Sequence, residues 1–506
     1  MVSFNRISGV ICDNVGLTGG SDLKAKSARG AVIFGAGTVT ERGLRFIRNM
    51  ILARILAPNE FGLMAIVMVA ATVFETFTEV GVRLSVIQNK RGANREYLNT
   101  AWWLQAIRGL VLFLVGIFLA PLISSFYNKP ELLNLLRVAF LAILFRGLIS
   151  PRMSVLRKEY KYGRVVLLSQ GSGIIGTFVA IGLAFMIRNV WALVIGFVAE
   201  SAVLCVLSYA LVPFLPRFGI DRKSLSELMK FVRGLIGSPI LKLIALQADI
   251  VVLAKMVTED RLGMYFLAVQ LAYLPMVLFN RIIRPVLLPA FSERQDDKDS
   301  LCRGLLKISR GGAILGIPFT AFMVSCASGI LLLAYGPKYV AVAAPFAVLS
   351  VCGLVRMQSG VFVAAYLALG RPHLIRRFAA LQAAIVVCLI YPAIVMFDLV
   401  GAIAVISLAS IVTLCFQVLF MKRLIGLQFL EYVRCWLPGL FASSIVLASA
   451  TSLHFFGIQS AVCNVVIVGL SCIAACALAL FFLKSNGQSA YGSRRNIERL
   501  KSLSSE

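Results

Sequence analysis

The sequence predicts an all-α polytopic membrane protein of about fourteen transmembrane helices, built as two six-helix lobes that are parallel repeats, followed by two C-terminal helices. Composition, the recurrence of apolar segments and an internal repeat predict this fold. Of the 506 residues, 59% are hydrophobic and 14% are charged, and the mean hydropathy is +0.88. A soluble domain carries about 25% charged residues, so we expect this chain to lie in lipid.

Apolar segments of spanning length recur along nearly the whole chain. A helix needs about 20 apolar residues to cross a bilayer, and short polar stretches separate the segments of that length here. Little sequence remains for a soluble domain. The expected spans are 30–56, 61–88, 101–126, 132–150, 165–187, 191–212, 232–257, 263–287, 308–334, 339–369, 374–397, 400–420, 435–455 and 460–483.

Positive charge indicates the orientation of these spans. Most of the 50 Lys and Arg residues fall in the two tails and the even-numbered loops, above all in 151–164 and 289–307, and cytoplasmic loops carry such an excess. We therefore expect both termini to be cytoplasmic, with no cleavable signal peptide in the charged, glycine-rich start. The expected segments are a tail (1–29), an N-lobe (30–212), a cytoplasmic linker (213–231), a C-lobe (232–420), the last two spans (421–483) and a tail (484–506).

Several classes of function do not fit this composition. The formal charge of +27 does not indicate nucleic-acid binding, because the basic residues lie in loops between spans and not on a soluble face. The 11 cysteines form no CxxC pair and the two histidines stand apart, so we expect no metal site and no cofactor. Short external connections such as 57–60 argue against a membrane glycosyltransferase, polymerase or ligase, whose chemistry needs loops carrying acids, histidines or metal ligands.

The chain resembles itself when it is shifted by 201 residues. Leu52–Leu56 then aligns with Leu253–Val257, and Phe61–Leu63 aligns with Leu262–Met264, without a gap. A shift of six spans preserves the direction of each helix, so the halves are expected to be parallel repeats with a binding site between them near mid-membrane. Spans 13 and 14 then lie outside the repeat, after its second half.

Charged residues inside the spans are the strongest functional signal. A charge at the bilayer centre costs roughly 2.5–3.5 kcal/mol, so such residues are expected to face a cavity or a partner, although Arg281 and Arg284 lie near a span end where they would also snorkel. Positions 41, 45 and 48 share one helical face. The candidate cations are Arg42, Arg45, Arg48, Lys242, Arg281, Arg284 and Arg356, and the candidate carboxylates are Glu41, Glu75, Glu79 and Asp249.

A cavity dominated by cations implies an anionic cargo. Arginine suits a pyrophosphate, because its fork donates several hydrogen bonds to phosphate oxygens and keeps its charge in a cavity of low dielectric. The carboxylates are candidates for ion coupling or gating, with a proton or sodium gradient as the driving force.

The repeat predicts specific ion pairs between the lobes. The 201-residue offset pairs Glu41 with Lys242 and Arg48 with Asp249, which reverses the sign of the charge at both positions. We expect Arg48 and Asp249 to form a latch near the external side. The alternative is that each charge pairs within its own lobe, Glu41 with Arg45 and Asp249 with a neighbouring polar group.

Several motifs resemble those of a known family. Leu52–Leu63 is similar to the L-A-R-x-L-x-P-x-E-F-G signature of bacterial polysaccharide flippases, and further matches follow in order over roughly residues 30–425, among them 77–81, 120–127, 247–253 and 289–292. The resemblance is to the polysaccharide transporter family of the multidrug/oligosaccharidyl-lipid/polysaccharide exporter superfamily, in its succinoglycan and colanic-acid exporter branch. Glu79 departs from the pattern, which has Asp there, so a role carried over to it is in doubt.

The resemblance implies a flippase of the bacterial inner membrane that moves undecaprenyl-pyrophosphate-linked oligosaccharide units for exopolysaccharide or lipopolysaccharide biosynthesis. Its expected partners are that lipid-linked oligosaccharide, the bilayer, and polysaccharide polymerase and export proteins. A multidrug or organic-cation exporter and a lipid II flippase remain alternatives of the same fold. An organic-cation exporter is expected to have an acidic or aromatic cavity, which the excess of arginines disfavours. The residues do not identify the sugar unit.

Overall fold

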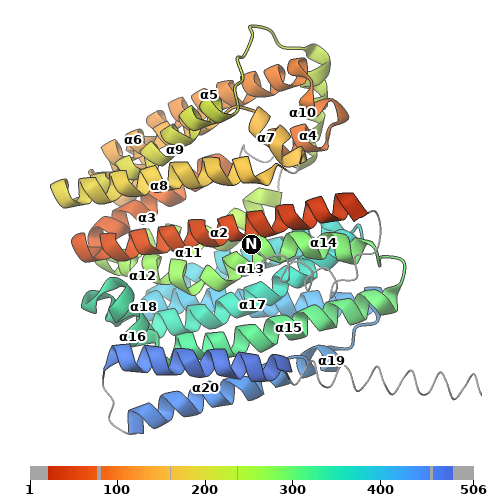
Figure 1. Cartoon of the computed structure of the whole chain (residues 1–506). Helices are drawn as coiled ribbons and strands as arrows, with labels where there is room; N and C mark the ends of the chain where they lie inside the picture. The colour runs from red at the N-terminus through yellow and green to blue at the C-terminus, as the bar shows by residue number, and fades with distance from the viewer. Residues whose placement is uncertain (1–20, 77–80, 160, 236–237, 456–459, 482–506) are drawn as a thin grey trace, which may run out of the picture.

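The structure is a computed structural model that describes residues 21–76, 81–159, 161–235, 238–455 and 460–481. Its regular elements are all helices, and the long ones run side by side along one common direction (Figure 1). The all-α polytopic membrane fold predicted from the sequence is confirmed.

The first half of the chain forms one group of helices, with α5, α6, α8 and α9 packed together and α2 and α3 beside them (Figure 1). The 14-residue helix α10 belongs to the segment that links this N-lobe to the next. The bounds are α2 (Ser21–Ile55), α3 (Pro58–Thr76), α4 (Val82–Gln88), η1 (Lys90–Ala93), α5 (Arg95–Tyr127), α6 (Leu132–Gly147), α7 (Arg152–Lys158), α8 (Tyr162–Ile187), α9 (Trp191–Leu211) and α10 (Arg222–Leu235).

The second half forms the C-lobe, and the last two long helices lie on its far side from the N-lobe (Figure 1). A final helix covers 461–481. The bounds are α11 (Ser238–Met256), α12 (Glu259–Ala272), α13 (Leu274–Ile282), α14 (Arg284–Ser292), α15 (Lys298–Ser325), α16 (Ala327–Tyr335), η2 (Pro337–Val342), α17 (Ala343–Ala368), α18 (Pro372–Ile425), α19 (Phe429–Arg434) and α20 (Leu437–Phe455).

Helical segments occupy all fourteen expected ranges, but fewer of them are both long and apolar enough to span a membrane. In the described part of the chain nine qualify, or eleven if each sharply bent pair counts as one span. The charged helices α2 and α11 are not among the nine. The 54-residue helix α18 is counted once, although Asp398 breaks it at φ 54° and ψ −137° between the expected spans 374–397 and 400–420. The count of fourteen crossings stays a prediction.

The expected span 263–287 is not a single straight helix, although α12 and α13 together qualify as one bent span. The structure divides it into α12, α13 and α14, with a bend of 41° between the first two. Pro275 and Pro285 stand at the first turns of α13 and α14. Proline lacks the N–H that would continue the preceding helix and clashes with its carbonyl, so each helix starts afresh there.

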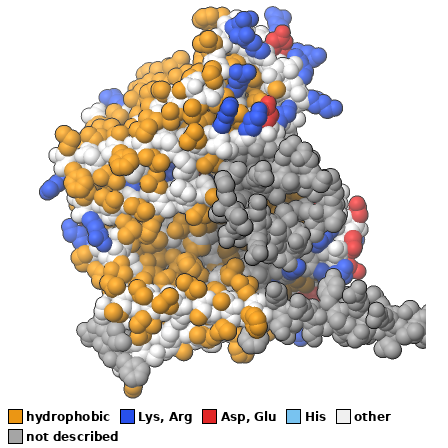
Figure 2. All heavy atoms as spheres, viewed as in Figure 1, with side chains coloured by type: hydrophobic (Ala, Val, Ile, Leu, Met, Phe, Trp, Pro, Cys, Tyr) orange, Lys and Arg blue, Asp and Glu red, His pale blue; other side chains and the backbone are white. Residues whose placement is uncertain are grey.

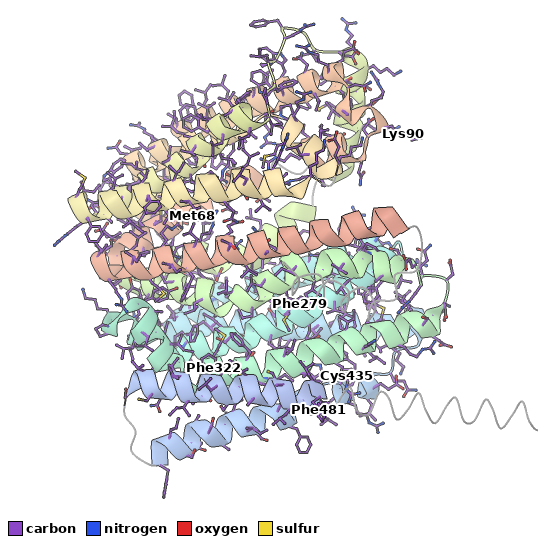
Figure 3. The ribbon with its side chains drawn as sticks, in the orientation of Figure 1. Met68, Lys90, Phe279, Phe322, Cys435 and Phe481 are labelled. Atoms are coloured by element: carbon purple, nitrogen blue, oxygen red, sulfur yellow. The ribbon has the colours of Figure 1, made fainter. Side chains whose placement is uncertain are left out.

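The bundle has two distinct ends, which are the left and right of Figure 1. The junction end carries the α2–α3 and α11–α12 connections, and the loop end carries α4, α7 and α10. Figure 2 shows hydrophobic side chains over the middle of the visible face and Lys, Arg, Asp and Glu clustered over the loop end of the N-lobe. Lys90 lies at this end, whereas Phe481 lies on the outer side of the last helix (Figure 3).

Helices α3 and α12 cross closely at the junction end because glycine allows it. A Cβ on Gly62 would lie 2.2 Å from the carbonyl oxygen of Glu259, and a Cβ on Gly263 would lie 1.9 Å from that of Pro58. Such contacts are too short for any other residue. Small residues bring backbones together in the same way at helix interfaces within membranes.

Polar contacts between the lobes also gather at the junction end. Arg54 donates to the carbonyl of Leu333 at 2.6 Å, and Lys255 donates to the carbonyl of Phe126. Each cation thus meets a last-turn carbonyl of a helix from the opposite lobe, where the helix dipole favours positive charge. Lys129 and Glu259 add an ion pair of 2.9 Å. These contacts hold the lobes together at this end.

Candidate cargo-binding cavity

A cavity of about 410 Å³ lies between the two lobes. It receives side chains from α2, α3, α8 and α9 on one side and from α11, α12, α13, α16 and α17 on the other. Apolar residues such as Met68 and Val277 make up most of its wall. Its charged lining residues are Arg42, Arg45, Arg48, Arg356 and Glu200.

Three of these arginines come from α2, as the sequence predicts. Glu41 lies one helical turn from Arg45, with 3.3 Å between the Glu41 Oε1 and Arg45 Nε atoms. Within the described part of the chain, the Nε atoms of Arg42, Arg45 and Arg48 are buried and donate no hydrogen bond, although that of Arg45 lies in this ion-pair contact with Glu41. Buried donors without acceptors are costly, so this face of α2 is suited to an anionic ligand.

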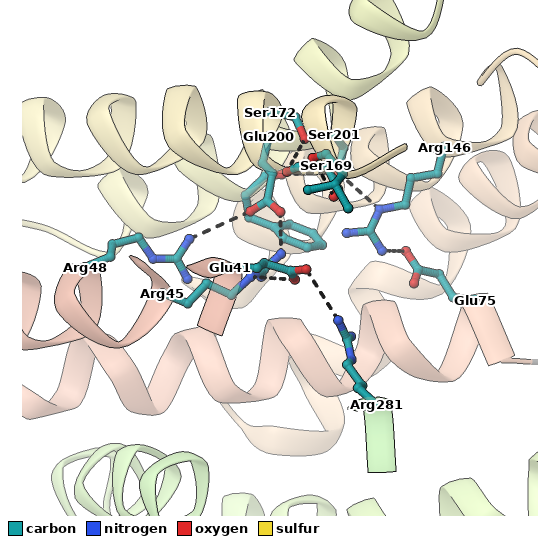
Figure 4. Close-up of polar contacts among 12 residues, drawn as sticks. Glu41, Arg45, Arg48, Glu75, Arg146, Ser169, Ser172, Glu200, Ser201 and Arg281 are labelled. Carbon is teal, nitrogen blue, oxygen red and sulfur yellow. Dashed lines mark hydrogen bonds and ion pairs between the residues drawn. The ribbon is translucent and has the colours of Figure 1, made fainter. Parts of the chain in front are cut away.

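Glu200 of α9 is the counter-charge of the α2 arginines. Its Oε1 lies 2.5 Å from Arg45 Nη2, and its Oε2 lies 3.8 Å from Arg48 Nη1. Figure 4 shows the carboxylate directed between the two guanidinium groups. The candidate set predicted from the sequence omits Glu200. The sequence nevertheless contained a signal for it, because Glu200 is the sole charged residue in the apolar segment 191–212. A charge inside the membrane is costly, so Glu200 also should have been expected to face a cavity or a partner.

Close packing of α8 against α9 fixes the position of Glu200. A Cβ on Gly176 of α8 would lie 2.7 Å from the Glu200 Cβ, and a Cβ on Gly196 would lie 2.5 Å from that of Ala180. The absence of these two side chains lets the helix backbones approach. The Glu200 carboxylate therefore projects from a tightly packed pair of helices toward α2.

Glu41 connects the lobes at the level of α13. Its Oε2 accepts from Nη1 of Arg281 at 3.4 Å (Figure 4), so Glu41 faces both Arg45 of its own lobe and a cation of the other lobe. Arg284 starts α14 and is half-buried, but neither it nor Arg281 lines the cavity. The prediction that both belong to the cavity wall therefore does not match this conformation.

A further ion pair of the N-lobe joins α6 to α3. Arg146 of α6 donates to Glu75 of α3, and its Nε donates to Ser201 at 3.2 Å (Figure 4). The guanidinium group also lies 5.1 Å from the centre of the Phe197 ring. The sequence indicates Glu75 but not its partner. Glu79 lies outside the described residues.

In the C-lobe, Asp249 and Arg356 are both buried. Asp249 accepts from the Tyr265 hydroxyl at 2.7 Å, and Arg356 donates from Nε to Ser410 at 3.0 Å. The Arg356 guanidinium lies 5.0 Å from the centre of the Tyr273 ring, within the range of a cation–π contact. Arg356 therefore presents its charge to the cavity from the side opposite α2.

The predicted Arg48–Asp249 latch is wrong for this conformation. Arg48 pairs with Glu200, and Asp249 is bonded to Tyr265 within its own lobe. The repeat places both residues at equivalent positions on α2 and α11. It does not determine how each helix is rotated about its own axis, and this rotation decides which side chains meet. The side chain of Lys242 lies outside the described part of the chain, so its predicted pair with Glu41 is not tested.

The charges that line the cavity are chemically suited to an anion. Four arginines and a single glutamate line it, and guanidinium groups bind phosphate oxygens through paired hydrogen bonds. Among the described residues, no group of three or more His, Cys, Asp and Glu side chains is arranged to hold a metal ion.

Known proteins of similar sequence act in polysaccharide biosynthesis. The lipopolysaccharide biosynthesis protein WzxC of Escherichia coli is 24% identical over 82% of this chain and 85% of its own length. The amylovoran biosynthesis protein AmsL of Erwinia amylovora is 26% identical over 72% of this chain and 96% of its own. The succinoglycan biosynthesis transport protein ExoT of Rhizobium meliloti is 25% identical over 63% of each chain.

Solved structures show the same fold. The lipid II flippase MurJ in an inward closed conformation superposes with a TM-score of 0.73 at 14% identity, covering 89% of this chain and 99% of its own. An inward-facing multidrug transporter of the MATE family gives 0.61 at 15%, covering 76% and 95%. The model of the polysaccharide biosynthesis protein family matches residues 51–344. This match covers more than half of the sequence, and the chain therefore belongs to that family.

Proposed function

We propose that the protein is a flippase that moves undecaprenyl-pyrophosphate-linked oligosaccharide units from the cytoplasmic to the periplasmic leaflet of a bacterial inner membrane. The observation that carries this proposal is the cavity between the lobes, in which four arginines face a single glutamate. Relatives with biosynthetic roles in lipopolysaccharide, amylovoran and succinoglycan support it. It is a transporter and not an enzyme.

The chemistry of the cavity favours this cargo over an organic cation. A cationic drug would meet three arginines on α2 and one on α17, and like charges at close range in a medium of low dielectric repel strongly. A pyrophosphate supplies acceptors for the buried Nε atoms of Arg42 and its two neighbours. Lipid II also carries a pyrophosphate, so the cavity charge alone does not separate these two cargoes.

The proposed orientation is supported by the basic loops. We propose that both termini and the loop end are cytoplasmic, because the loop end carries the excess of Lys and Arg. The junction end is then periplasmic, and the contacts at Gly62, Gly263 and Lys129 close it in this conformation. Transport requires these contacts to open once cargo is bound. Polysaccharide polymerase and export proteins would act on the cargo after its release.

Coupling to a proton or sodium gradient is part of the proposal. Glu75 and Asp249 are the described intramembrane carboxylates proposed to exchange such an ion. Each has a partner in this conformation, Arg146 and Tyr265 respectively. Cargo movement in proteoliposomes that responds to neither ion gradient would remove this part of the proposal and leave the flippase itself in place.

The test is export in cells that lack the chromosomal gene. Arg45→Ala and Arg48→Ala are each expected to lower surface polysaccharide at least tenfold while the protein reaches the membrane at normal levels. Arg303→Ala removes an exposed arginine of α15 outside this cavity and should export normally. Full export by both α2 variants would exclude their arginines from the cargo site.

A further inference from the structure

Glu200 occupies the position that an anionic cargo group needs. Its two carboxylate oxygens approach Arg45 at 2.5 Å and Arg48 at 3.8 Å. The side chain is 12% exposed, against 34% and 19% for the two arginines, so all three form a partly dry cluster at the cavity wall. A phosphate would present its oxygens to the same two guanidinium groups.

The cluster contains more donors than acceptors. Arg42, Arg45 and Arg48 lie along one stretch of α2, whereas Glu200 and Glu41 are the carboxylates paired with them in the described part of the chain. Glu41 is shared further with Arg281. An incoming anion can therefore be bound by this cluster when Arg45 and Arg48 turn away from Glu200.

Movement is easier on the arginine side of the contact. Glu200 is short, and its backbone is held against α8 at Gly176. An arginine side chain has more rotatable bonds and a longer reach. The exchange from Glu200 to cargo thus needs new side-chain rotamers on α2 and no separation of α8 from α9.

We propose that Glu200 is an internal competitor of the cargo, whose carboxylate pairs with Arg45 and Arg48 in the empty carrier and is replaced there by a phosphate of the cargo. This inference rests on the proposed function. Because cargo can bind only while Glu200 is away from the arginines, the apparent affinity for cargo is the intrinsic affinity multiplied by the fraction of time that the site is free. It also helps release, because Glu200 restores a counter-charge to two largely buried arginines as the phosphate leaves.

The test is a titration of the purified full-length protein in detergent with inorganic pyrophosphate, followed by calorimetry. Glu200→Gln keeps the shape of the side chain and removes its charge, so it should bind pyrophosphate about tenfold more tightly if Glu200 fills the site roughly nine-tenths of the time. Glu200→Ser provides a second neutral variant should the first be poorly folded. Both variants should nevertheless export less polysaccharide than the wild type, because release becomes slow.

Glu227→Gln is the matched control. Glu227 also pairs with an arginine, Arg91, at 3.3 Å, but it lies on α10 outside the cavity and should leave pyrophosphate binding unchanged. Unchanged binding in both Glu200 variants would overturn the competitor role. Weaker binding would also overturn it and would show that Glu200 orients the arginines.

The inference and the proposed function fail differently. If Arg45→Gln abolishes binding while the Glu200 variants bind like wild type, the anion site stands and only the competitor role is lost. If the wild-type protein binds no pyrophosphate, both the anion site and the role of Glu200 are overturned.

Discussion

Gly62 and Gly263 occupy equivalent positions of the two lobes, and each lies against the backbone of the other lobe. A Cβ on Gly62 would meet the Glu259 carbonyl, and a Cβ on Gly263 would meet the Pro58 carbonyl. Positions 58 and 259 differ by 201 residues, as the two glycines do. The contact is therefore reciprocal, as expected of parallel repeats related by an axis along the membrane normal.

Replacing either glycine should weaken closure of the junction end. Gly263→Ala puts a Cβ 1.9 Å from a backbone oxygen, which no side-chain rearrangement relieves, so α3 and α12 must separate. The measurement is crosslinking by a short bismaleimide between two introduced cysteines, Lys129→Cys and Glu259→Cys. The variant that carries only these two substitutions should crosslink well, and the same variant with Gly263→Ala should crosslink several-fold less. Gly182→Ala, where a Cβ meets nothing within 4 Å, is the control; equal crosslinking in all three would refute closure by the glycines.

The ion pair of Lys129 with Glu259 should behave as a coupled pair between the lobes. Lys129→Glu and Glu259→Lys each place like charges about 3 Å apart and should each lower export. The double variant restores opposite charges and should recover part of the loss. Losses that simply add would show that the pair does not stabilise the closed end.

The hydrogen bond of Tyr265 to Asp249 should contribute measurably to stability. Tyr265→Phe removes the side-chain donor to the buried Asp249 carboxylate, which we expect to cost about 1–3 kcal/mol. Thermal unfolding in detergent measures the loss. The control is Tyr339→Phe, because the buried Tyr339 hydroxyl has no hydrogen-bond partner among the described residues. A loss in the control as large as that in Tyr265→Phe would contradict the assignment.

Asp221 should make the start of α10 sensitive to pH. Its carboxylate accepts from the Ser224 hydroxyl at 2.6 Å and the Ser224 N–H at 2.9 Å, and these bonds hold the pKa of Asp221 below its usual value. A lowered folded-state pKa means that the stabilisation is present above the unfolded pKa and is lost as the pH falls through the folded one. Hydrogen exchange of the first turn, corrected for intrinsic rates, should accelerate with acid in the wild type and remain level in Asp221→Asn.

The sequence predicts the helices and the arginine face of α2 well, because these follow from local periodicity and hydropathy. The repeat aligns Gly62 with Gly263, and the structure shows that both lie where α3 and α12 cross. The breaks before α13 and α14 were predictable in principle from Pro275 and Pro285. They were not predicted because the apolar character of residues 263–287 indicated a single span.

Helical spacing offered the pair of Glu41 with Arg45 as an alternative, and the structure contains it. The ion pairs between different helices were not predictable, because they depend on how each helix is rotated about its axis. That rotation is set by packing, such as the approach of Gly176 to Glu200, which brings Glu200 rather than Asp249 to Arg48. Arg146 likewise appears in the sequence as one more arginine near a span end, and only the packing of α6 beside α3 pairs it with Glu75.

Translocation of a fluorescent polyprenyl-pyrophosphate-linked oligosaccharide in proteoliposomes tests the central claim most directly. A membrane-impermeant quencher reports how much of the lipid-linked sugar has crossed. The account predicts rapid crossing with the wild-type protein and at least a tenfold slower rate with the Arg45→Gln/Arg48→Gln double variant, whereas Arg303→Gln matches the wild type. A double variant as fast as the wild type, or a wild-type rate equal to that of empty liposomes, would contradict it.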